Sequence, residues 1–331
     1  MKKKRVLLGA VIVFGAIVLG IAILLFKPVS VRGLTSQPDP TGDYAEAVER
    51  IEALWAQEAS LSLNPLCQLQ LMTHGQKAER AIVFVHGYTN CPQQFSELGQ
   101  EFYDLGYNVL IVPAPHHGLA DRMTTDHAQL TAEELAAYAD EVVDIAQGLG
   151  EHVSMAGISM GGIATAWAAQ QRSDLDLAVL ISPAFGFKMI PAPATAPAVN
   201  AFLVLPNLYQ WTDSELKEEN GPAYTYPRRS TRALAQTLRF SMAVQAESAE
   251  VPTAARSMLV ITNANDTSVD NALTAEMVAS WREWGVDVAT YEFAADLELK
   301  HDLIDPSQQT QPVVYPVLVE LITKAAERPG E

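Results

Sequence analysis

Short apolar runs, most of them rich in β-branched residues, recur along the chain and are typical of strands in a buried sheet. They lie at residues 67–73, 81–85, 107–112, 152–156, 177–181, 258–262 and 286–293. Segments of helical character separate most of them, at about 92–105, 131–149, 163–169, 272–284 and 312–326. This alternation predicts an α/β fold with a mostly parallel central sheet and helices on both faces.

The alternation stops between Ser182 and about Ala255, where aromatic residues stand among prolines and turn residues. We expect an inserted helical cap at about 183–255, within a main domain that spans 43–331. A short amphipathic helix is expected near the start of that domain, because Asp43 and Glu46 form a capping-box pattern ahead of a one-sided apolar face.

The chain begins with a basic cluster, Lys2 to Arg5, followed by an uncharged apolar run from Val6 to Phe26. That run has the ~20 residues that a membrane-spanning helix needs. A cleaved signal peptide is the alternative, but the apolar run ends in a poor cleavage site. We therefore expect a membrane anchor at 1–26 and a stalk at 27–42. Because basic clusters stay cytoplasmic, the main domain is expected outside the cytosol, periplasmic or extracellular.

Composition excludes several classes of protein. The formal net charge is −17, so the surface repels nucleic acid, and no nucleic-acid partner is expected. The chain has only 2 cysteines, too few for a disulfide scaffold or a cysteine zinc site. Composition does not predict the oligomeric state.

The first candidate catalytic motif is Gly157-Ile158-Ser159-Met160-Gly161, which follows a predicted strand and begins a predicted helix. In that setting Gly-x-Ser-x-Gly is typical of a nucleophile elbow, which exposes the serine on a tight, strained turn. The helix that follows points its N-terminus at the serine and favours negative charge there.

A serine hydroxyl needs a base, and the base needs an acid to orient it. Asp266 follows the strand at 258–262, and His301 follows the strand at 286–293. The order Ser159, Asp266, His301 places each residue at the carboxyl end of a predicted strand. Asp270 is the alternative acid, whereas His301 is the only histidine after either aspartate.

A serine that attacks a carbonyl also needs backbone donors for the oxyanion. We expect these to be the N–H groups of Tyr88, after the strand at 81–85, and of Met160, after the serine. His86 is expected to brace the loop at Tyr88. The adjacent pair His116 and His117 is also expected to brace its loop, with metal binding as the alternative.

Together these features resemble the α/β-hydrolase superfamily from about Leu66 to Ala326, and within it the capped carboxylesterase and monoacylglycerol-lipase-like branch. The resemblance rests on the elbow at Ser159, the loop at His86-Gly87-Tyr88-Thr89, the loop at His117-Gly118, Asp266 and His301. Ile158 departs from the histidine that many relatives carry there, which puts the substrate range in doubt.

The resemblance implies a serine hydrolase that cleaves carboxylic esters through an acyl-enzyme and needs no metal or organic cofactor. The aromatic cap suggests an apolar acyl or aryl group in a small ester or lipid-like substrate. An aminopeptidase-like peptidase, a thioesterase and an acyltransferase remain alternatives on the same triad. A non-catalytic, membrane-anchored binding module is the alternative from another class.

Three further features lie near the expected site. If the main domain lies outside the cytosol, Cys67 and Cys91 are expected to form a disulfide that pins the loop after Tyr88, with two unpaired buried thiols as the alternative. Arg228-Arg229 is expected to be solvated, with binding of a carboxylate or phosphate as the alternative. Glu215, Glu218 and Glu219 are the acids that a peptidase would use to hold a free amine, but they resemble a solvated helix face.

Overall fold

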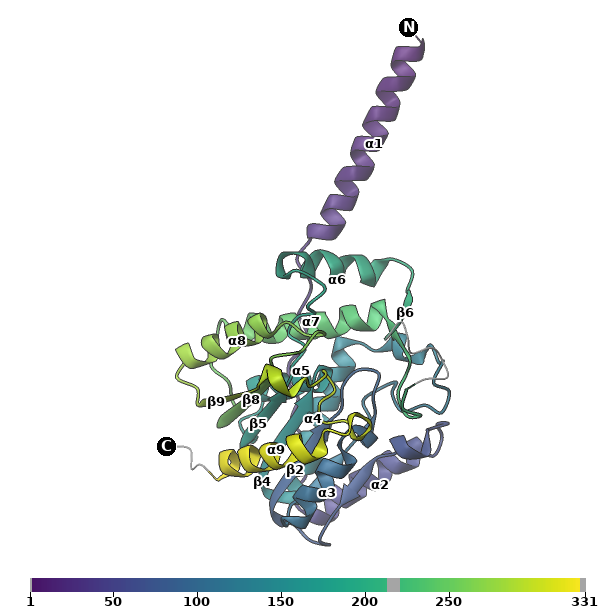
Figure 1. Cartoon of the computed structure of the whole chain (residues 1–331). Coiled ribbons are helices and arrows are strands. Elements are labelled where there is room, and N and C mark those ends of the chain that lie inside the picture. Colours follow the sequence, from purple (N-terminus) through teal and green to yellow (C-terminus); the bar gives the residue numbers. More distant parts are fainter. Residues whose placement is uncertain (1, 213–220, 328–331) are drawn as a thin grey trace.

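The architecture comes from a computed structural model, in which secondary structure is described for residues 2–212 and 221–327, and side chains from residue 11 onward. A seven-stranded sheet forms the centre, in the order β1-β3-β2-β4-β5-β8-β9 (Figure 1). Its strands are β1 (Gln70–Met72), β2 (Ala78–Val85), β3 (Asn108–Ile111), β4 (Gly150–Ile158), β5 (Leu177–Ile181), β8 (Ser257–Asn263) and β9 (Val288–Phe293). All neighbours pair in parallel except β1 with β3, so the predicted mostly parallel sheet is confirmed.

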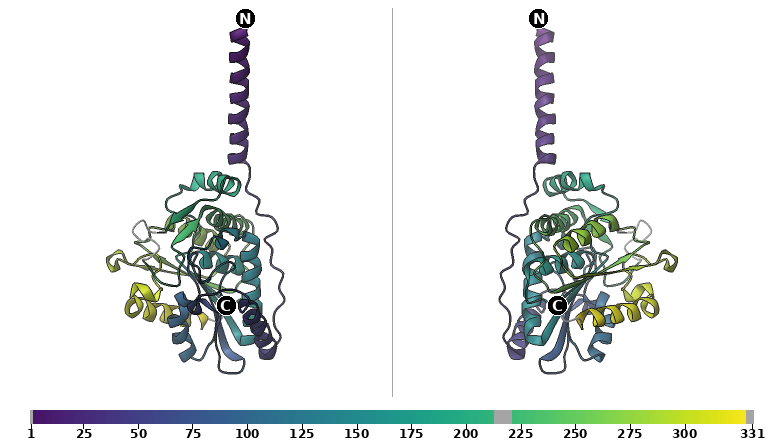
Figure 2. Two further views of the ribbon diagram at one scale, coloured as in Figure 1. Left: turned by 90° about the vertical axis from the view of Figure 1, so that its right-hand side faces the viewer. Right: turned by 90° about the vertical axis from the view of Figure 1, so that its left-hand side faces the viewer.

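Helices cover both faces of this sheet (Figure 2). They are α2 (Tyr44–Glu58), α3 (Ser96–Asp104), α4 (Ala132–Leu149), α5 (Met160–Gln171), α7 (Thr231–Ser248), α8 (Asn271–Glu283) and α9 (Gln311–Ala326). Short 3-10 helices lie at Pro65–Cys67, Pro92–Phe95, Asp126–Gln129, Ala192–Ala194, Ala295–Leu297 and Pro306–Gln308.

Alternate residues of one strand enter two separate apolar cores. Val83 and Val85 of β2 pack in the core on the side of α4, α5, α7 and α8. Ile82 and Phe84 pack in the core on the side of α3 and α9. This two-sided burial explains why the strands are apolar throughout rather than alternating.

Two predicted helix starts are present as expected. Asp43 accepts a hydrogen bond from the Glu46 N–H at 3.0 Å, and α2 begins at the next residue. Thr131 and Glu134 form a complete capping box at the start of α4. These contacts are local in sequence, and local patterns therefore located them.

The segment predicted as a cap holds α6 (Thr195–Val204), a two-stranded sheet of β6 (Tyr209–Trp211) and β7 (Arg228–Ser230), and α7. Phe240 and Val244 of α7 are fully buried in the main core beside α5. In contrast, α6 is the outermost element of this segment (Figure 1). The division of the chain at 43 and 183–255 stays a prediction.

The predicted membrane anchor is wrong. The segment forms α1 (Lys2–Phe26), which extends away from the rest of the chain (Figure 1). Among the helices described, none is long and apolar enough to cross a membrane. The predicted transmembrane helix, membrane partner and location outside the cytosol are corrected on this finding.

The stretch predicted as a stalk lies along the body (Figure 2). The Trp167 indole N–H donates to the Leu34 carbonyl at 2.8 Å, and the Gln37 N–H donates to Asp140 at 2.7 Å. At its start, the Asn200 side chain on α6 donates to the Lys27 carbonyl at 2.8 Å. These bonds fasten residues 27–42 to α4, α5 and α6.

Candidate active site

Ser159 stands alone between β4 and α5 in a strained backbone conformation, with φ 57° and ψ −113°. Its N–H donates to the Ile181 carbonyl at 3.0 Å, which fixes the turn against β5. A Cβ on Gly157 would lie 2.2 Å from the Gly161 carbonyl oxygen, and one on Gly161 would lie 2.1 Å from the Val85 carbonyl oxygen. Both elbow glycines are therefore required by close backbone approach.

His301 and Asp266, far apart in sequence, meet at the carboxyl ends of β8 and β9. The His301 Nδ1 lies 2.7 Å from the Asp266 Oδ2. The other carboxylate oxygen of Asp266 accepts the N–H groups of Ser268 at 2.8 Å and Val269 at 3.1 Å. The alternative acid, Asp270, instead caps α8 by accepting the Ala272 N–H at 3.0 Å.

The surroundings shift the pKa values of Asp266 and His301 in opposite directions. Burial raises the pKa of Asp266, but the hydrogen bond from His301 and the backbone donors outweigh it, so the pKa lies below its ordinary value. Burial lowers the pKa of His301, but the hydrogen bond to Asp266 and the charge of Asp302 outweigh it, so the pKa lies above its ordinary value. Asp266 thus favours an imidazolium at position 301.

A cavity of ≈ 300 Å³ brings the predicted residues together. Its lining comprises Tyr88, Thr89, Ser159, Met160, Ala184, Phe187, Met189, Thr212, Arg229, Leu234, Thr237, Thr267, Ser268, Val269, His301 and Asp302. The serine and histidine predicted to react, and both residues predicted to supply oxyanion donors, thus face one space.

The loop at Tyr88 is tied to the loop at His301 by a residue that sequence reasoning missed. Gln94 is fully buried, accepts the Gly87 N–H at 2.8 Å and donates to Asp302 at 3.1 Å. A second tie joins the Asn90 amide to Asp305 at 2.7 Å. A buried glutamine in the first turn after a loop has no local signature, so only the fold reveals this role.

The histidines before the serine have the bracing contacts expected of them. His86 donates from Nδ1 to the Gly87 carbonyl at 2.8 Å and accepts the Ala114 N–H at Nε2, at 2.9 Å. His116 lies 2.8 Å from Asp126, and His117 Nδ1 lies 2.8 Å from the Pro115 carbonyl. Across the described residues no group of His, Cys, Asp and Glu is arranged to hold a metal ion.

The Tyr88 side chain packs in an aromatic cluster with His117 and His127. Its hydroxyl donates to His127 Nδ1 at 2.7 Å and accepts the Ser230 N–H at 2.9 Å. Burial lowers the pKa of His127 to about 4, so this ring is a neutral acceptor. The backbone of Tyr88 is thereby fixed beside the cavity, and its amide is left without a partner among the described residues.

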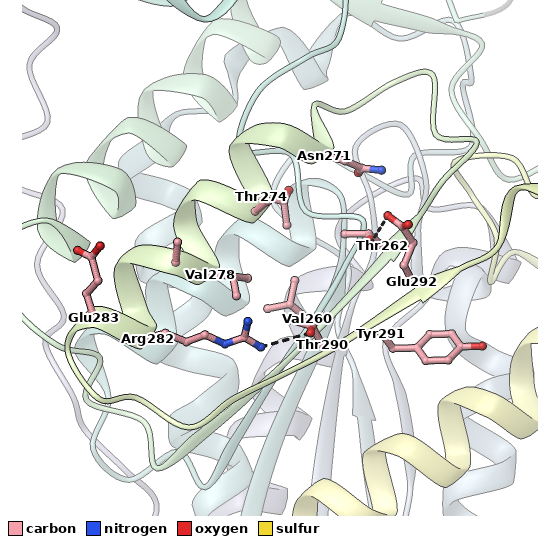
Figure 3. Close-up of a pocket in the computed structure, with 12 residues that line it drawn as sticks. Val260, Thr262, Asn271, Thr274, Val278, Arg282, Glu283, Thr290, Tyr291 and Glu292 are labelled. Carbon is pink, nitrogen blue, oxygen red and sulfur yellow. Dashed lines mark hydrogen bonds between the residues drawn. The ribbon is translucent and has the colours of Figure 1, made fainter.

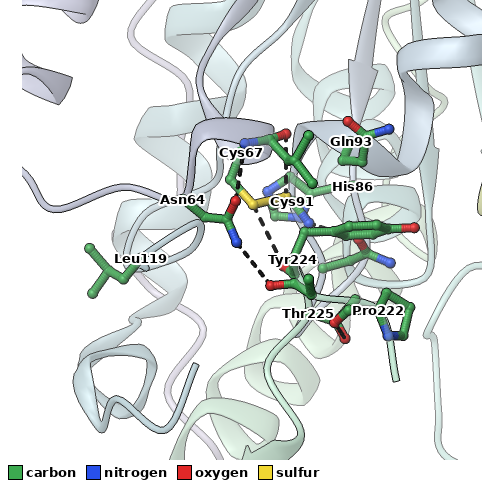
Figure 4. The surroundings of a disulfide bond; sticks show 12 residues. Asn64, Cys67, His86, Cys91, Gln93, Leu119, Pro222, Tyr224 and Thr225 are labelled. Carbon is green, nitrogen blue, oxygen red and sulfur yellow. Dashed lines mark hydrogen bonds between the residues drawn. A yellow bond between two sulfur atoms is a disulfide. The ribbon is translucent and has the colours of Figure 1, made fainter. Parts of the chain in front are cut away.

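Cys67 and Cys91 are joined by a disulfide, with their Cα atoms 5.2 Å apart (Figure 4). Cys91 follows the loop that begins at Tyr88, so the bond fixes that loop to the chain ahead of β1. Asn64 continues this attachment by donating to the Ala223 carbonyl at 2.9 Å, near the beginning of β7.

The two arginines of β7 have different surroundings, which corrects the expectation that both are solvated. Arg228 donates to the Met123 carbonyl at 2.5 Å and lies 5.0 Å from the centre of the Tyr209 ring. Arg229 lines the cavity that contains Ser159.

A larger cavity of ≈ 650 Å³ lies at the sheet edge between α8 and β9 (Figure 3). Its polar groups bond to one another: Thr262 donates to Glu292 at 3.2 Å, and Arg282 donates to Thr290 at 3.3 Å. It lacks both a nucleophile with a base and any of the predicted site residues, so we place the chemistry at Ser159 instead.

The fold and the serine turn define a lipase-like serine hydrolase of the α/β-hydrolase class. The chain belongs to the family described as Serine aminopeptidase, S33, which it matches over residues 76–295.

Known proteins agree with this class. The chain is 24% identical over 172 residues to the "Thermostable monoacylglycerol lipase" of Bacillus sp. (strain H-257), a match that covers 50% of this chain and 63% of that lipase. A solved structure from work on LipS and LipT, two metagenome-derived lipolytic enzymes, has a TM-score of 0.59 at 19% identity, covering 79% of this chain and 99% of its own. The Paleococcus ferrophilus monoacylglycerol lipase has a TM-score of 0.58 at 17% identity, covering 78% and 98%. At these identities the solved structures establish the fold alone.

Proposed function

We propose that this protein hydrolyses carboxylic esters through an acyl-enzyme on Ser159. The observation that carries the proposal is the placement of Ser159, on a strained turn, in one cavity with His301, whose Nδ1 is bound by the buried Asp266. A hydrogen bond from Nδ1 to Asp266 leaves Nε2 as the atom that accepts a proton.

In the first half-reaction, the Ser159 oxygen forms a bond to the ester carbonyl carbon while His301 Nε2 takes the hydroxyl proton. The tetrahedral intermediate then collapses, the bond to the alcohol oxygen breaks, and His301 returns the proton to the leaving alcohol. Water repeats the sequence on the acyl-enzyme and releases the acid. Asp266 holds the imidazole in the required tautomer and stabilises its cation.

The Tyr88 and Met160 N–H groups are proposed to hold the oxyanion in both half-reactions. Met160 begins α5, so its amide lies at the positive end of the helix dipole. Gln94, the disulfide and the Tyr88 hydroxyl hold the other donor loop in place. Donors fixed in advance need no reorganisation as charge develops.

The substrate is proposed to be a small ester with an apolar part. Phe187, Met189 and Leu234 line the cavity and come from the segment predicted as the cap, which therefore acts as one wall of the site. The cavity volume lies at the lower end of the ~300–1,000 Å³ that is usual for ligand sites. Short acyl or aryl groups fit this volume better than long chains.

A fluorophosphonate probe followed by an ester panel tests the proposal. We expect the probe to label Ser159 in folded protein, and Ser159→Ala and His301→Ala to abolish both labelling and turnover of aryl esters. Folded protein that neither labels nor turns over any ester would establish the non-catalytic binding module instead. Thioester and amide analogues in the same panel separate the thioesterase, acyltransferase and peptidase alternatives.

The family description gives one reason to keep peptidase activity in that panel. Glu215, Glu218 and Glu219, the acids that a peptidase would use to hold a free amine, lie outside the described residues. In the described part of the lining, Arg229 is a cation, and Asp302 is the single carboxylate. Burial raises the pKa of Asp302, and its carboxylate already accepts the Gln94 amide. These surroundings repel a substrate ammonium, so ester cleavage remains the better-supported function.

A further inference from the structure

Arg229 lies in the catalytic cavity and has no counterion among the residues that the structure describes. It stands in the middle of β7, opposite Gln210 of β6, and lines the same space as Ser159 and His301. Its Nε is buried and has no hydrogen-bond partner in the described part of the chain. Within the described ranges of the chain, no carboxylate forms an ion pair with its guanidinium, although Arg172 and Arg239 both have such pairs.

The two neighbouring arginines of β7, Arg228 and Arg229, have different orientations and different partners. Successive side chains of a strand point to opposite faces. Arg228 does not line the cavity, and its partly buried guanidinium contacts the Met123 carbonyl and the Tyr209 ring instead. Arg229 points to the other face, into the cavity, and no described residue accepts a hydrogen bond from its Nε.

No charged group on the described residues around the cavity neutralises Arg229. Asp302 already accepts the Gln94 amide at 3.1 Å, and Asp266 is engaged by His301 and two backbone donors. A partly buried cation without a partner costs free energy, and an anionic ligand would offset that cost. Guanidinium binds carboxylate and phosphate through two parallel hydrogen bonds.

We propose that Arg229 is a specificity-determining residue that binds an anionic group, a carboxylate or a phosphate, carried by the ester substrate. This inference rests on the proposed ester hydrolysis and names the substrate class that the site prefers. The apolar residues Phe187 and Leu234 then contact the uncharged part of the same molecule, while Ser159 attacks its ester carbonyl carbon.

Two matched substrate pairs test the proposal and separate the two anions. Mono-4-nitrophenyl glutarate and 4-nitrophenyl valerate differ by a carboxylate on the acyl side. 1-Butyrylglycerol 3-phosphate and 1-butyrylglycerol differ by a phosphate on the alcohol side. The readout is the ratio of kcat/KM for the charged member over the neutral member of each pair, in which the fraction of folded enzyme cancels.

We expect the native protein to prefer the charged member of at least one pair. Arg229→Gln should lower that ratio at least about tenfold, the usual worth of a hydrogen bond to a charged group. Arg229→Lys should retain part of the preference, since it keeps the charge and loses the paired donors. Arg232→Gln removes an equal charge from an exposed position on α7 and should leave the ratio unchanged.

The outcomes distinguish this inference from the proposed function. Hydrolysis of neutral esters with no preference for either charged member, and the same ratios in Arg229→Gln, would overturn the anion site and leave ester hydrolysis standing. An equal fall in the ratio for Arg232→Gln would assign the preference to long-range charge and overturn the role of Arg229. Absence of turnover for all four substrates, together with absence of fluorophosphonate labelling, would refute the proposed function itself.

Discussion

At the scale of single residues, the serine turn depends on two glycines, because a side chain at either position would collide with the backbone of a neighbouring segment. Gly157 and Gly161 allow β4, α5 and the end of β2 to approach one another at distances that no Cβ permits. Ser159 keeps its strained φ of 57° because its N–H and carbonyl are both held, by Ile181 and Ala184. Such strain persists only where the surroundings over-determine the backbone.

We predict that Gly161→Ala destabilises the protein by roughly 1–3 kcal/mol, the usual cost of overpacking, and sharply lowers ester turnover. The added Cβ would lie 2.1 Å from the Val85 carbonyl oxygen, so β2 and the serine must both shift. Urea denaturation and turnover per labelled serine measure the two effects.

Gly42→Ala is the matched control for this glycine, because a Cβ there meets only the mobile end of Glu46, at 3.6 Å. Equal stability and equal turnover in the two variants would show that the elbow tolerates a side chain at position 161.

The charge state of His301 gives a prediction about pH. A general base must be neutral, and the pKa of His301 lies above its ordinary value of 6.5. The kcat/KM for a neutral ester should therefore rise with pH through a midpoint above 6.5. Asp266→Asn removes the anion that raises this pKa, so the midpoint should move down, and kcat should fall by about 10²–10⁴.

Asp270→Asn is the control for that substitution, since asparagine also caps helices and Asp270 caps α8. We expect its pH profile to match that of the native protein. A profile shifted by Asp270→Asn but not by Asp266→Asn would show that the acid has been assigned to the wrong residue.

At the scale of elements, the loop after β2 is held by contacts from three separate parts of the chain. The disulfide attaches it to the segment before β1, Gln94 and Asn90 attach it to the His301 loop, and Ser230 attaches the Tyr88 hydroxyl to the end of β7. This loop carries the Tyr88 amide, so its rigidity bears directly on the oxyanion site.

We predict that the double variant Cys67→Ala/Cys91→Ala is less stable by about 3 kcal/mol, because the lost bond closes a short loop in the unfolded chain. The two cysteines are 24 positions apart. Turnover should fall as well, since the Tyr88 loop loses one of its ties. Urea denaturation of the native protein with and without reductant provides the comparison, and reduction should reproduce the loss.

A double variant as stable as the oxidised native protein would show that the remaining ties suffice. Gln94→Ala then provides the second test of this element. It removes both the acceptor for Gly87 and the donor to Asp302. If Gln94→Ala also left turnover unchanged, the loop would not need these ties for catalysis.

At the scale of the whole molecule, buried neutral histidines make the fold sensitive to acid. Burial lowers the pKa of His86 to about 4, from an ordinary value of 6.5, and lowers that of His127 to about 4. Between about pH 4 and pH 6.5 these histidines bind a proton in the unfolded chain but not in the native protein. Stability contributed by each histidine is therefore present above pH 6.5 and is lost as pH falls towards 4.

We predict that the free energy of unfolding falls with pH across this window, with His86 alone contributing about 3 kcal/mol of the change. His86→Gln should be less stable at pH 7 but should lose less stability on acidification. Denaturant titrations at several pH values measure both slopes, and the exposed His152→Gln serves as the control for replacing an imidazole. Identical slopes for native protein and His86→Gln would contradict the prediction.

The sequence determined the layered sheet and the positions of most strands and helices. The five inner strands of the central sheet were visible because burial on both faces demands an apolar run, and α2 and α4 were visible because caps are local contacts. The strands β6 and β7 were not predicted, because they lie in the segment expected to be a helical cap. The order Ser159, Asp266, His301 was also visible, since each follows a strand that the pattern located. Boundaries moved by only a few residues, as at β4, which begins at Gly150.

The tertiary structure alone decided which of several equivalent residues meet in space. Asp266 rather than Asp270 reaches His301, Gln94 joins two loops that are distant in sequence, and Arg229 faces the cavity while Arg228 does not. It also placed α7 in the main core. Local patterns report burial and turn geometry, but contacts across some 35 to 215 positions depend on how the sheet brings strand ends together.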